Sequence, residues 1–224
     1  MTASAARTEP PASFRADDVF RRIAERIPPA LAADALDSAV TPPFGDHSLN
    51  DWAISPDFLA GARAAAVLIG LVPRDGAVHV ILTERTAGLR AHAGQVAFPG
   101  GKVDPGDASP AAAALREAWE EIGLPPNRVS VLGHLGAYLT RTGFRIIPVV
   151  ARVEPPFTLR INPAEVADAF ELPFGILMDA GNHLLRQREW MGAPRSFYAI
   201  EHGGRTVWGI TAGILRVLYE RLYA

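Results

Sequence analysis

The chain has 224 residues, a net charge of −2 from 22 basic and 24 acidic residues, and no cysteine. The near balance of charge excludes a global attraction to nucleic acid or to an anionic membrane, and the lack of cysteine excludes disulfides, thiolate metal sites and a cysteine nucleophile. No apolar run approaches the roughly 18 residues of a membrane span, so the sequence predicts a cytoplasmic protein with one large domain.

The N-terminal part predicts a tail and a helical extension. Residues 1–12 are small, polar and proline-containing, so we expect a flexible tail. A helix follows with Ser13 as its cap, and prolines across residues 30–58 predict loops with short helical pieces. The apolar residues of the first helix recur at helical spacing: Phe20, Ile23 and Ile27. We expect residues 13–224 to form one domain, with residues 13–60 as its extension.

Apolar, β-branched runs after residue 63 predict a sheet. AAAVLIGLV and VHVILTER flank Pro73–Gly76 and predict a hairpin, and QVAF predicts a short strand just before Gly100. VSVLGHLGAYLT and FRIIPVVARV predict a second strand pair around Gly143.

The last third of the chain mixes helical and strand patterns. Residues 163–169 and 174–178 predict short helices, and HLLRQREWM, SFYAIEH and TVWG predict strands. The segment ITAGILRVLYERL predicts an amphipathic helix that packs either inside the monomer or at a homodimer interface. Its apolar stripe consists of Ile210, Ile214, Val217 and Leu218. Strands flanked by a central and a terminal helix predict an α/β fold, an α/β/α sandwich with a mixed sheet.

The stretch FPGGKVDPGDASPAAAALREAWEEIGL predicts a glycine turn, a loop and the central helix. Gly100 and Gly101 permit a close approach of the backbone to another group. Ser109 or Asp107 can cap the helix, and Gly123 ends it.

Three carboxylates project from one face of this helix, because Glu117, Glu120 and Glu121 stand at i, i+3 and i+4. Like charges at this spacing repel, so the cluster indicates a divalent cation. The alternative is a solvated helix face on which Arg116 supplies ordinary ion pairs.

The segment REAWEEIGL resembles the second half of the Nudix box, the loop-helix signature of hydrolases that cleave a nucleoside diphosphate linked to another moiety. The first half departs from that pattern, because Asp107 replaces glutamate and one extra residue precedes Arg116. Aspartate can still form the expected salt bridge with Arg116.

One branch of the family is more similar. ILTERTAGLRAHAGQVAFPGG resembles the motif upstream of the box in coenzyme A pyrophosphatases, and the resemblance covers most of residues 64–218. Four residues fall on that motif: Arg85, Arg90, Gly94 and Phe98.

This resemblance implies a Nudix-type fold and hydrolysis of coenzyme A or its thioesters at the pyrophosphate, to 3′,5′-ADP and 4′-phosphopantetheine, with Mg²⁺ or Mn²⁺. It implies Glu117 and Glu121 as direct metal ligands, with Glu120 as a further ligand. Glu120 or Glu165 would be the general base, and Arg116 would support catalysis. Four residues would bind substrate: Arg85, Arg90, Gly100 and Gly101. The alternatives are hydrolysis of ADP-ribose, NADH or a nucleoside triphosphate, and a catalytically silent module that binds nucleotide.

Overall fold

The computed structural model describes residues 14–86, 94–190 and 192–224. The predicted tail and the predicted helix cap Ser13 lie outside these residues. Among the residues described, no helix has the length and apolar character needed to cross a membrane.

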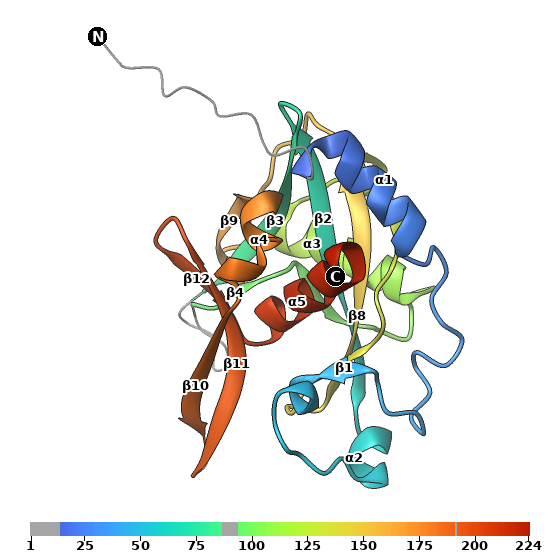
Figure 1. Cartoon of the computed structure of the whole chain (residues 1–224). Coiled ribbons are helices and arrows are strands. Elements are labelled where there is room, and N and C mark those ends of the chain that lie inside the picture. Colours follow the sequence, from blue (N-terminus) through green and yellow to red (C-terminus); the bar gives the residue numbers. More distant parts are fainter. Residues whose placement is uncertain (1–13, 87–93, 191) are drawn as a thin grey trace.

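A large mixed sheet forms the centre of the molecule (Figure 1). Its strands are β1 (Phe44–Gly45), β2 (Arg63–Arg74), β3 (Ala77–Arg85), β4 (Val96–Ala97), β5 (Gly100–Lys102), β6 (Val129–His134), β7 (Tyr138–Leu139), β8 (Phe144–Val153) and β9 (Val166–Pro173). The main order is β1-β7-β8-β2-β3-β4, and β5, β6 and β9 pair with β2, β8 and β3. Strands β2 and β8 are parallel, from the pair Arg63 and Phe144 to the pair Leu71 and Arg152.

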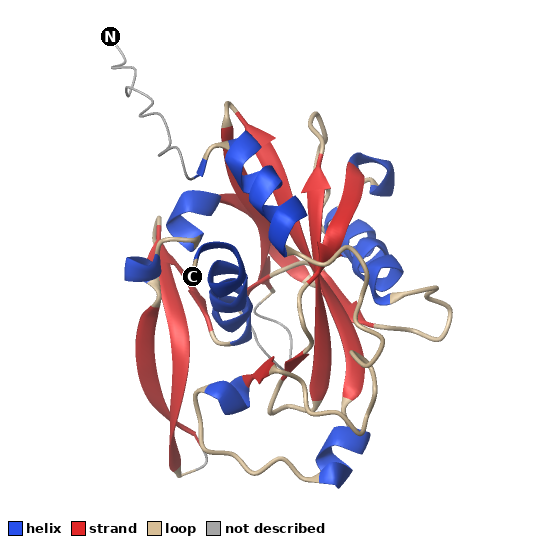
Figure 2. Cartoon of the chain, turned by 45° about the vertical axis from the view of Figure 1, so that its right-hand side comes forward, coloured by secondary structure: helices blue, strands red, loops and turns tan. Residues whose placement is uncertain are grey.

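Helices cover both faces of this sheet (Figure 2). Helices α1 (Ala16–Arg26), α4 (Phe174–Leu177) and α5 (Ile210–Tyr223) lie on one face and α3 (Pro110–Ile122) lies on the other, whereas α2 (Pro56–Ala60) lies beyond the ends of the strands (Figure 1). Alternate residues of β2 enter different cores, since Ile69 packs in the core with α1, α4 and α5, whereas Leu68 packs in the core with α3. Strand β2 is therefore apolar on both faces, and the predicted α/β/α sandwich is confirmed.

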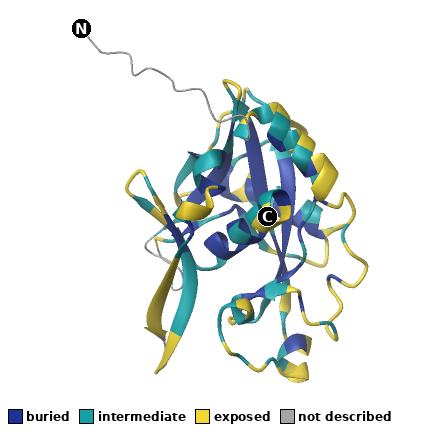
Figure 3. Cartoon of the chain, in the orientation of Figure 1, coloured by how far each residue is buried: buried dark blue, intermediate teal, exposed yellow. Residues whose placement is uncertain are grey.

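A second, antiparallel sheet covers the outer side of α5. It consists of β10 (Leu184–Trp190), β11 (Ala193–His202) and β12 (Arg205–Trp208). Much of α5 is buried (Figure 3). Its buried apolar residues are Ala212, Ile214, Leu215, Val217, Leu218 and Leu222. Of the two predicted locations for this helix, the structure shows packing inside the monomer.

The predicted hairpin between β2 and β3 is confirmed with a tighter turn. Asp75 and Gly76 have φ angles of 48° and 81°, and Arg74 pairs directly with Ala77. Positive φ at both central residues is typical of the two-residue turn that suits the strand twist.

The helix predicted at residues 163–169 is wrong. Asn162 accepts a hydrogen bond at its side-chain oxygen from the Ala164 N–H at 3.2 Å, and β9 begins at Val166. Strand β9 pairs antiparallel with β3, so the open edge of β3 draws this segment into the sheet. The short strand β1 was also not predicted, because a two-residue strand carries no periodic pattern.

Candidate active site

Helix α3 has the boundaries that its sequence predicts. The Ser109 hydroxyl accepts a hydrogen bond from the Ala112 N–H at 3.1 Å, and Pro110 occupies the first turn. Gly123 ends the helix with a φ of 64°. The three glutamates therefore lie in the last two turns of α3.

Two glycines bring strand β5 close to both β2 and α3. A Cβ atom on Gly100 would lie 2.3 Å from the Ala66 carbonyl oxygen, and its φ is 153°. A Cβ atom on Gly101 would lie 2.5 Å from the carboxyl carbon of Glu117. A side chain is excluded at Gly100 by the backbone of β2, and one at Gly101 would displace the Glu117 carboxylate. The Glu117 carboxylate therefore lies directly against the backbone of β5.

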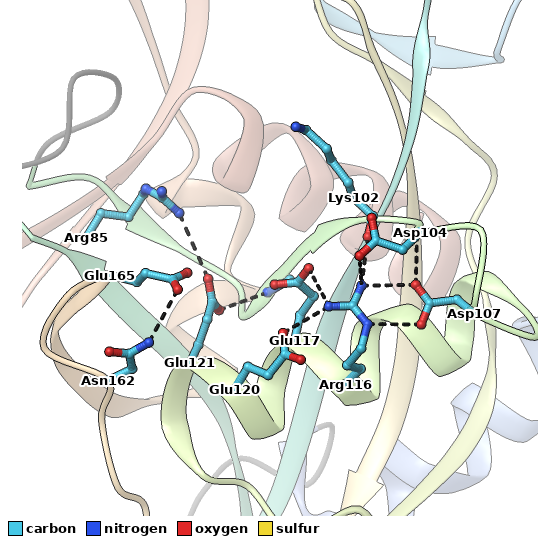
Figure 4. Close-up of polar contacts among 11 residues, drawn as sticks. Arg85, Lys102, Asp104, Asp107, Arg116, Glu117, Glu120, Glu121, Asn162 and Glu165 are labelled. Atoms are coloured by element: carbon cyan, nitrogen blue, oxygen red, sulfur yellow. Dashed lines mark hydrogen bonds and ion pairs between the residues drawn. The ribbon is translucent and has the colours of Figure 1, made fainter.

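Arg116 connects the loop to the glutamate face (Figure 4). Its Nε and Nη2 atoms each donate to one oxygen of Asp107 at 3.0 Å, which confirms the predicted acid–arginine pair. Its Nη1 donates to Glu117 at 3.0 Å and to Glu120 at 2.9 Å. The hydrogen bonds from Arg116 hold the pKa of Asp107 below its usual value. Arg116 thus fixes the loop and offsets part of the negative charge.

Glu121 is the most enclosed carboxylate of the site, with 3% of the residue exposed. Its Oε2 accepts a hydrogen bond from the Gly100 N–H at 3.1 Å, and its Oε1 lies 4.0 Å from Nη1 of Arg85. Burial raises the pKa of Glu121 to about 7, although the Gly100 N–H acts in the opposite direction. Burial also raises the pKa of Glu117. Both carboxylates are partly desolvated, and a nearby cation would stabilise their charged forms.

Glu165 reaches the same region from a separate loop. Asn162 donates its backbone N–H to the Glu121 carbonyl at 2.8 Å, which ties this loop to the end of α3. The Asn162 side chain also donates to the Glu165 carboxylate at 3.3 Å. Burial is the main cause of the raised pKa of Glu117 and Glu121, and the negative charge of Glu165 adds to it. Figure 4 shows Glu165 beside Glu121 and Arg85.

The side chains present fit a hard divalent cation. Glu117 and Glu121 offer carboxylate oxygens, the ligand type that Mg²⁺ prefers, in a partly desolvated position with excess negative charge. In the arrangement described, no three acidic or histidine side chains are grouped so that they could hold a metal. Instead Arg116 is bonded to Glu117 and Glu120, and Gly100 is bonded to Glu121.

The structure brings together every predicted site residue that it describes, and Arg90 lies outside the described residues. Arg85 stands at the end of β3, and its Nε is buried without a hydrogen-bond partner among the residues described. Asn162 and the carbonyl of Lys102, which accepts from Arg116 at 3.1 Å, were not predicted as parts of the site. The Asn-Pro dipeptide was the available signal for the turn at Asn162.

A cavity of about 520 Å³ lies elsewhere, under residues 28–44, and none of the three glutamates lines it. Buried Arg145 donates to the carbonyls of Ala35 at 3.3 Å and Val40 at 2.8 Å at its wall. Arg145 thereby attaches this loop to the sheet.

Comparison with known proteins places the chain among related sequences. The model of the NUDIX domain matches residues 62–192. A protein named "Uncharacterized Nudix hydrolase NudL" from Citrobacter koseri is 45% identical over 160 residues, which are 70% of this chain and 81% of that protein. Its namesake from Escherichia coli K12 is 42% identical over 166 residues, with the same coverage of 70% and 81%.

Solved structures overlap with part of the chain. RenU, a Nudix hydrolase from M. smegmatis, is 27% identical with a TM-score of 0.40, over 51% of this chain and 72% of that one. DR0079 from Deinococcus radiodurans is 15% identical with a TM-score of 0.46, over 72% of this chain and 83% of that one. The family assignment rests on the sequence matches.

Replacement of Gly101 by alanine should disrupt the site, because the new methyl group would overlap with the Glu117 carboxylate. We expect hydrolysis of nucleoside diphosphate derivatives to fall roughly 100-fold, the size of effect that a misplacement of about 1 Å can produce. Gly106→Ala is the matched control, because a Cβ atom there meets nothing within 4 Å. Steady-state rates and melting temperatures of both variants test this. Equal rates for the two variants would contradict the close contact between β5 and α3.

Proposed function

The chain belongs to the Nudix hydrolase family, and from this premise we propose that it cleaves the pyrophosphate of coenzyme A or its thioesters. The products are 3′,5′-ADP and 4′-phosphopantetheine or its acyl derivative, and the cofactor is Mg²⁺ or Mn²⁺. The observation that carries the hydrolytic proposal is the pair of desolvated carboxylates, Glu117 and Glu121, held against the backbone of β5. The coenzyme A proposal is supported by the motif between Ile81 and Gly101.

Glu117 and Glu121 are the proposed metal ligands, and Glu120 is a more exposed third candidate with 51% of its side chain accessible. When bound, a divalent cation polarises a phosphoryl oxygen and lowers the pKa of water. Other side chains of the protein hold the carboxylates in position. Arg116 keeps Glu117 and Asp107 in position, since its guanidinium bonds to both carboxylates at 3.0 Å.

Arg85 is the proposed phosphate ligand. Its guanidinium lies at the edge of the glutamate face, 4.0 Å from Glu121, and it is also about one-third exposed. A planar guanidinium can bind two oxygens of a pyrophosphate at once and offset the charge that develops on the leaving group. The intact carboxylates and this arginine argue against a catalytically silent binding module.

Glu165 is the proposed general base, rather than Glu120. The Glu120 carboxylate is already engaged, because its Oε2 accepts a hydrogen bond from Arg116 at 2.9 Å. Glu165 accepts only a long hydrogen bond of 3.3 Å from Asn162 among the bonds found in the described residues. It also lies on the loop that is tied to the end of α3.

The substrate proposal predicts a clear preference. Purified protein with Mg²⁺ or Mn²⁺ should hydrolyse coenzyme A with a higher kcat/KM than ADP-ribose, NADH or a nucleoside triphosphate. Phosphorus NMR of the products identifies the bond that breaks. A preference for ADP-ribose or NADH would contradict the coenzyme A assignment but leave the assignment as a hydrolase intact. Absence of turnover with every substrate would contradict both assignments.

The assignment of the base predicts different effects for two conservative variants. Glu165→Gln should lower kcat about 10²- to 10⁴-fold, the usual range for loss of a general base. Glu120→Gln should lower kcat by much less, and Glu25→Gln on the exposed surface of α1 serves as the control. Rates at several pH values separate the two roles, because only loss of the base removes the acidic limb of the profile. The reverse order of effects would assign the base to Glu120.

A further inference from the structure

Three segments that are far apart in the sequence meet beside the second sheet. Asn50 and Ser196 exchange two hydrogen bonds, from Asn50 Nδ2 to the Ser196 carbonyl at 3.1 Å and from the Ser196 N–H to Asn50 Oδ1 at 2.9 Å. These bonds join the segment after β1 to strand β11. The turn between β7 and β8 joins the same place, because the Arg141 N–H donates to Asp46 at 2.8 Å. The meeting point therefore has a fixed geometry.

Asp46 forms its hydrogen bonds with a backbone N–H and a hydroxyl group, and its charge also acts on Arg195. Its carboxylate accepts from the Arg141 backbone N–H and, at 3.3 Å, from the Tyr138 hydroxyl. Burial raises the pKa of Asp46 above its usual value. The Arg141 guanidinium instead lies 5.4 Å from the centre of the Trp52 ring, which holds the exposed side chain in place by a cation–π contact.

In the described part of the chain, three arginines gather at this point around a single interacting carboxylate, Asp46. Arg195 of β11 stands directly opposite Arg188 of β10, a pairing of like charges that destabilises a sheet. The pKa of Arg195 is lowered first by burial and then by the positive charge of Arg141, and the negative charge of Asp46 acts in the opposite direction. Among the residues described, none of these three arginines forms a salt bridge, whereas Arg186 on the same hairpin is bonded to Glu201 at 3.2 Å. The excess positive charge indicates a site for an anion.

We propose that Arg141 and Arg195, with Arg188 beside them, bind the 3′-phosphate of the substrate, an inference that rests on the proposed function. The register of β2 gives the backbone spacing between the turn that carries Arg141 and strand β5. The Arg63 N–H donates to the Gly143 carbonyl, and Ala66 pairs with Gly101. Arg63 and Ala66 are three residues apart in β2, so the Gly143 carbonyl and Gly101 lie about 10 Å apart along the strand at roughly 3.3 Å per residue.

A backbone spacing of this size leaves room for coenzyme A between the two places, because one ribose separates its 3′-phosphate from its pyrophosphate. A phosphate monoester carries nearly two negative charges and matches the bidentate geometry of guanidinium groups. The arginine cluster would therefore distinguish coenzyme A from nucleoside diphosphate derivatives without a 3′-phosphate.

Comparison of coenzyme A with 3′-dephospho-coenzyme A tests the site. The wild-type protein should have a lower KM for coenzyme A. The double variant Arg141→Gln, Arg195→Gln should raise that KM about 10- to 100-fold, leave kcat unchanged, and alter the KM for the dephospho compound less than about two-fold. Arg186→Gln is the matched control, because Glu201 already neutralises Arg186. Equal losses with both substrates, or equal wild-type KM values, would overturn the proposal.

A binding measurement separates the site from the catalytic proposal. In calorimetric titrations the wild-type protein should bind adenosine 3′,5′-bisphosphate at least about 10-fold more tightly than AMP, and the double variant should lose this difference. If coenzyme A is not hydrolysed but the difference in binding persists, the proposed function fails and the phosphate site stands. Equal binding of the two nucleotides to the wild-type protein overturns the site whatever the turnover.

Discussion

The site depends on a carboxylate that is held out of water. Glu121 is buried against the glycine backbone of β5, and the Gly100 N–H donates a hydrogen bond to its Oε2 at 3.1 Å. Burial raises its pKa to about 7, from 4.5 for an ordinary glutamate carboxyl group. A raised pKa of an acid means that folding stability is lost as pH increases from about 4.5 through 7, because the folded state binds the proton more tightly. A bound cation would offset this loss of stability, because it favours the charged form of the carboxylate.

The rest of the fold maintains this arrangement from several directions. Strand β2 is buried on both faces, pairs with β5 at the glycines and lies parallel to β8, so it fixes one wall of the site. The loop around Asn162 closes the end of α3 and carries Glu165. The second sheet is tied to β3 and β9 by Arg205, which bonds to Glu84 at 2.7 Å and to Asp168 at 2.5 Å. These ion pairs tie the sheet that carries Arg188 and Arg195 to the strands beside the glutamate site.

Local signals allowed much of the site to be predicted from the sequence. Ser109 and Gly123 define the ends of α3, the spacing of the glutamates defines their common face, and Asp107 pairs with Arg116 as expected. Features that depend on distant partners could not be predicted. The segment after Pro163 has a helical sequence pattern but forms strand β9, because it pairs with the open edge of β3. The meeting of Arg141 with Arg195 depends on hydrogen bonds between Asn50 and Ser196, a pair with no common sequence motif.

The most direct test of the account is the unfolding free energy of Glu121→Gln, measured in denaturant with EDTA and with saturating Mn²⁺. Without metal, the variant should be about 2–3 kcal/mol more stable than the wild type at pH 8, because it removes a buried charge, and the difference should vanish near pH 4. Saturating Mn²⁺ should stabilise the wild type by about 3 kcal/mol at 100 times its Kd and the variant by much less. Equal stabilities in EDTA at both pH values, together with equal gains from Mn²⁺, would contradict the assignment of Glu121 as a metal ligand.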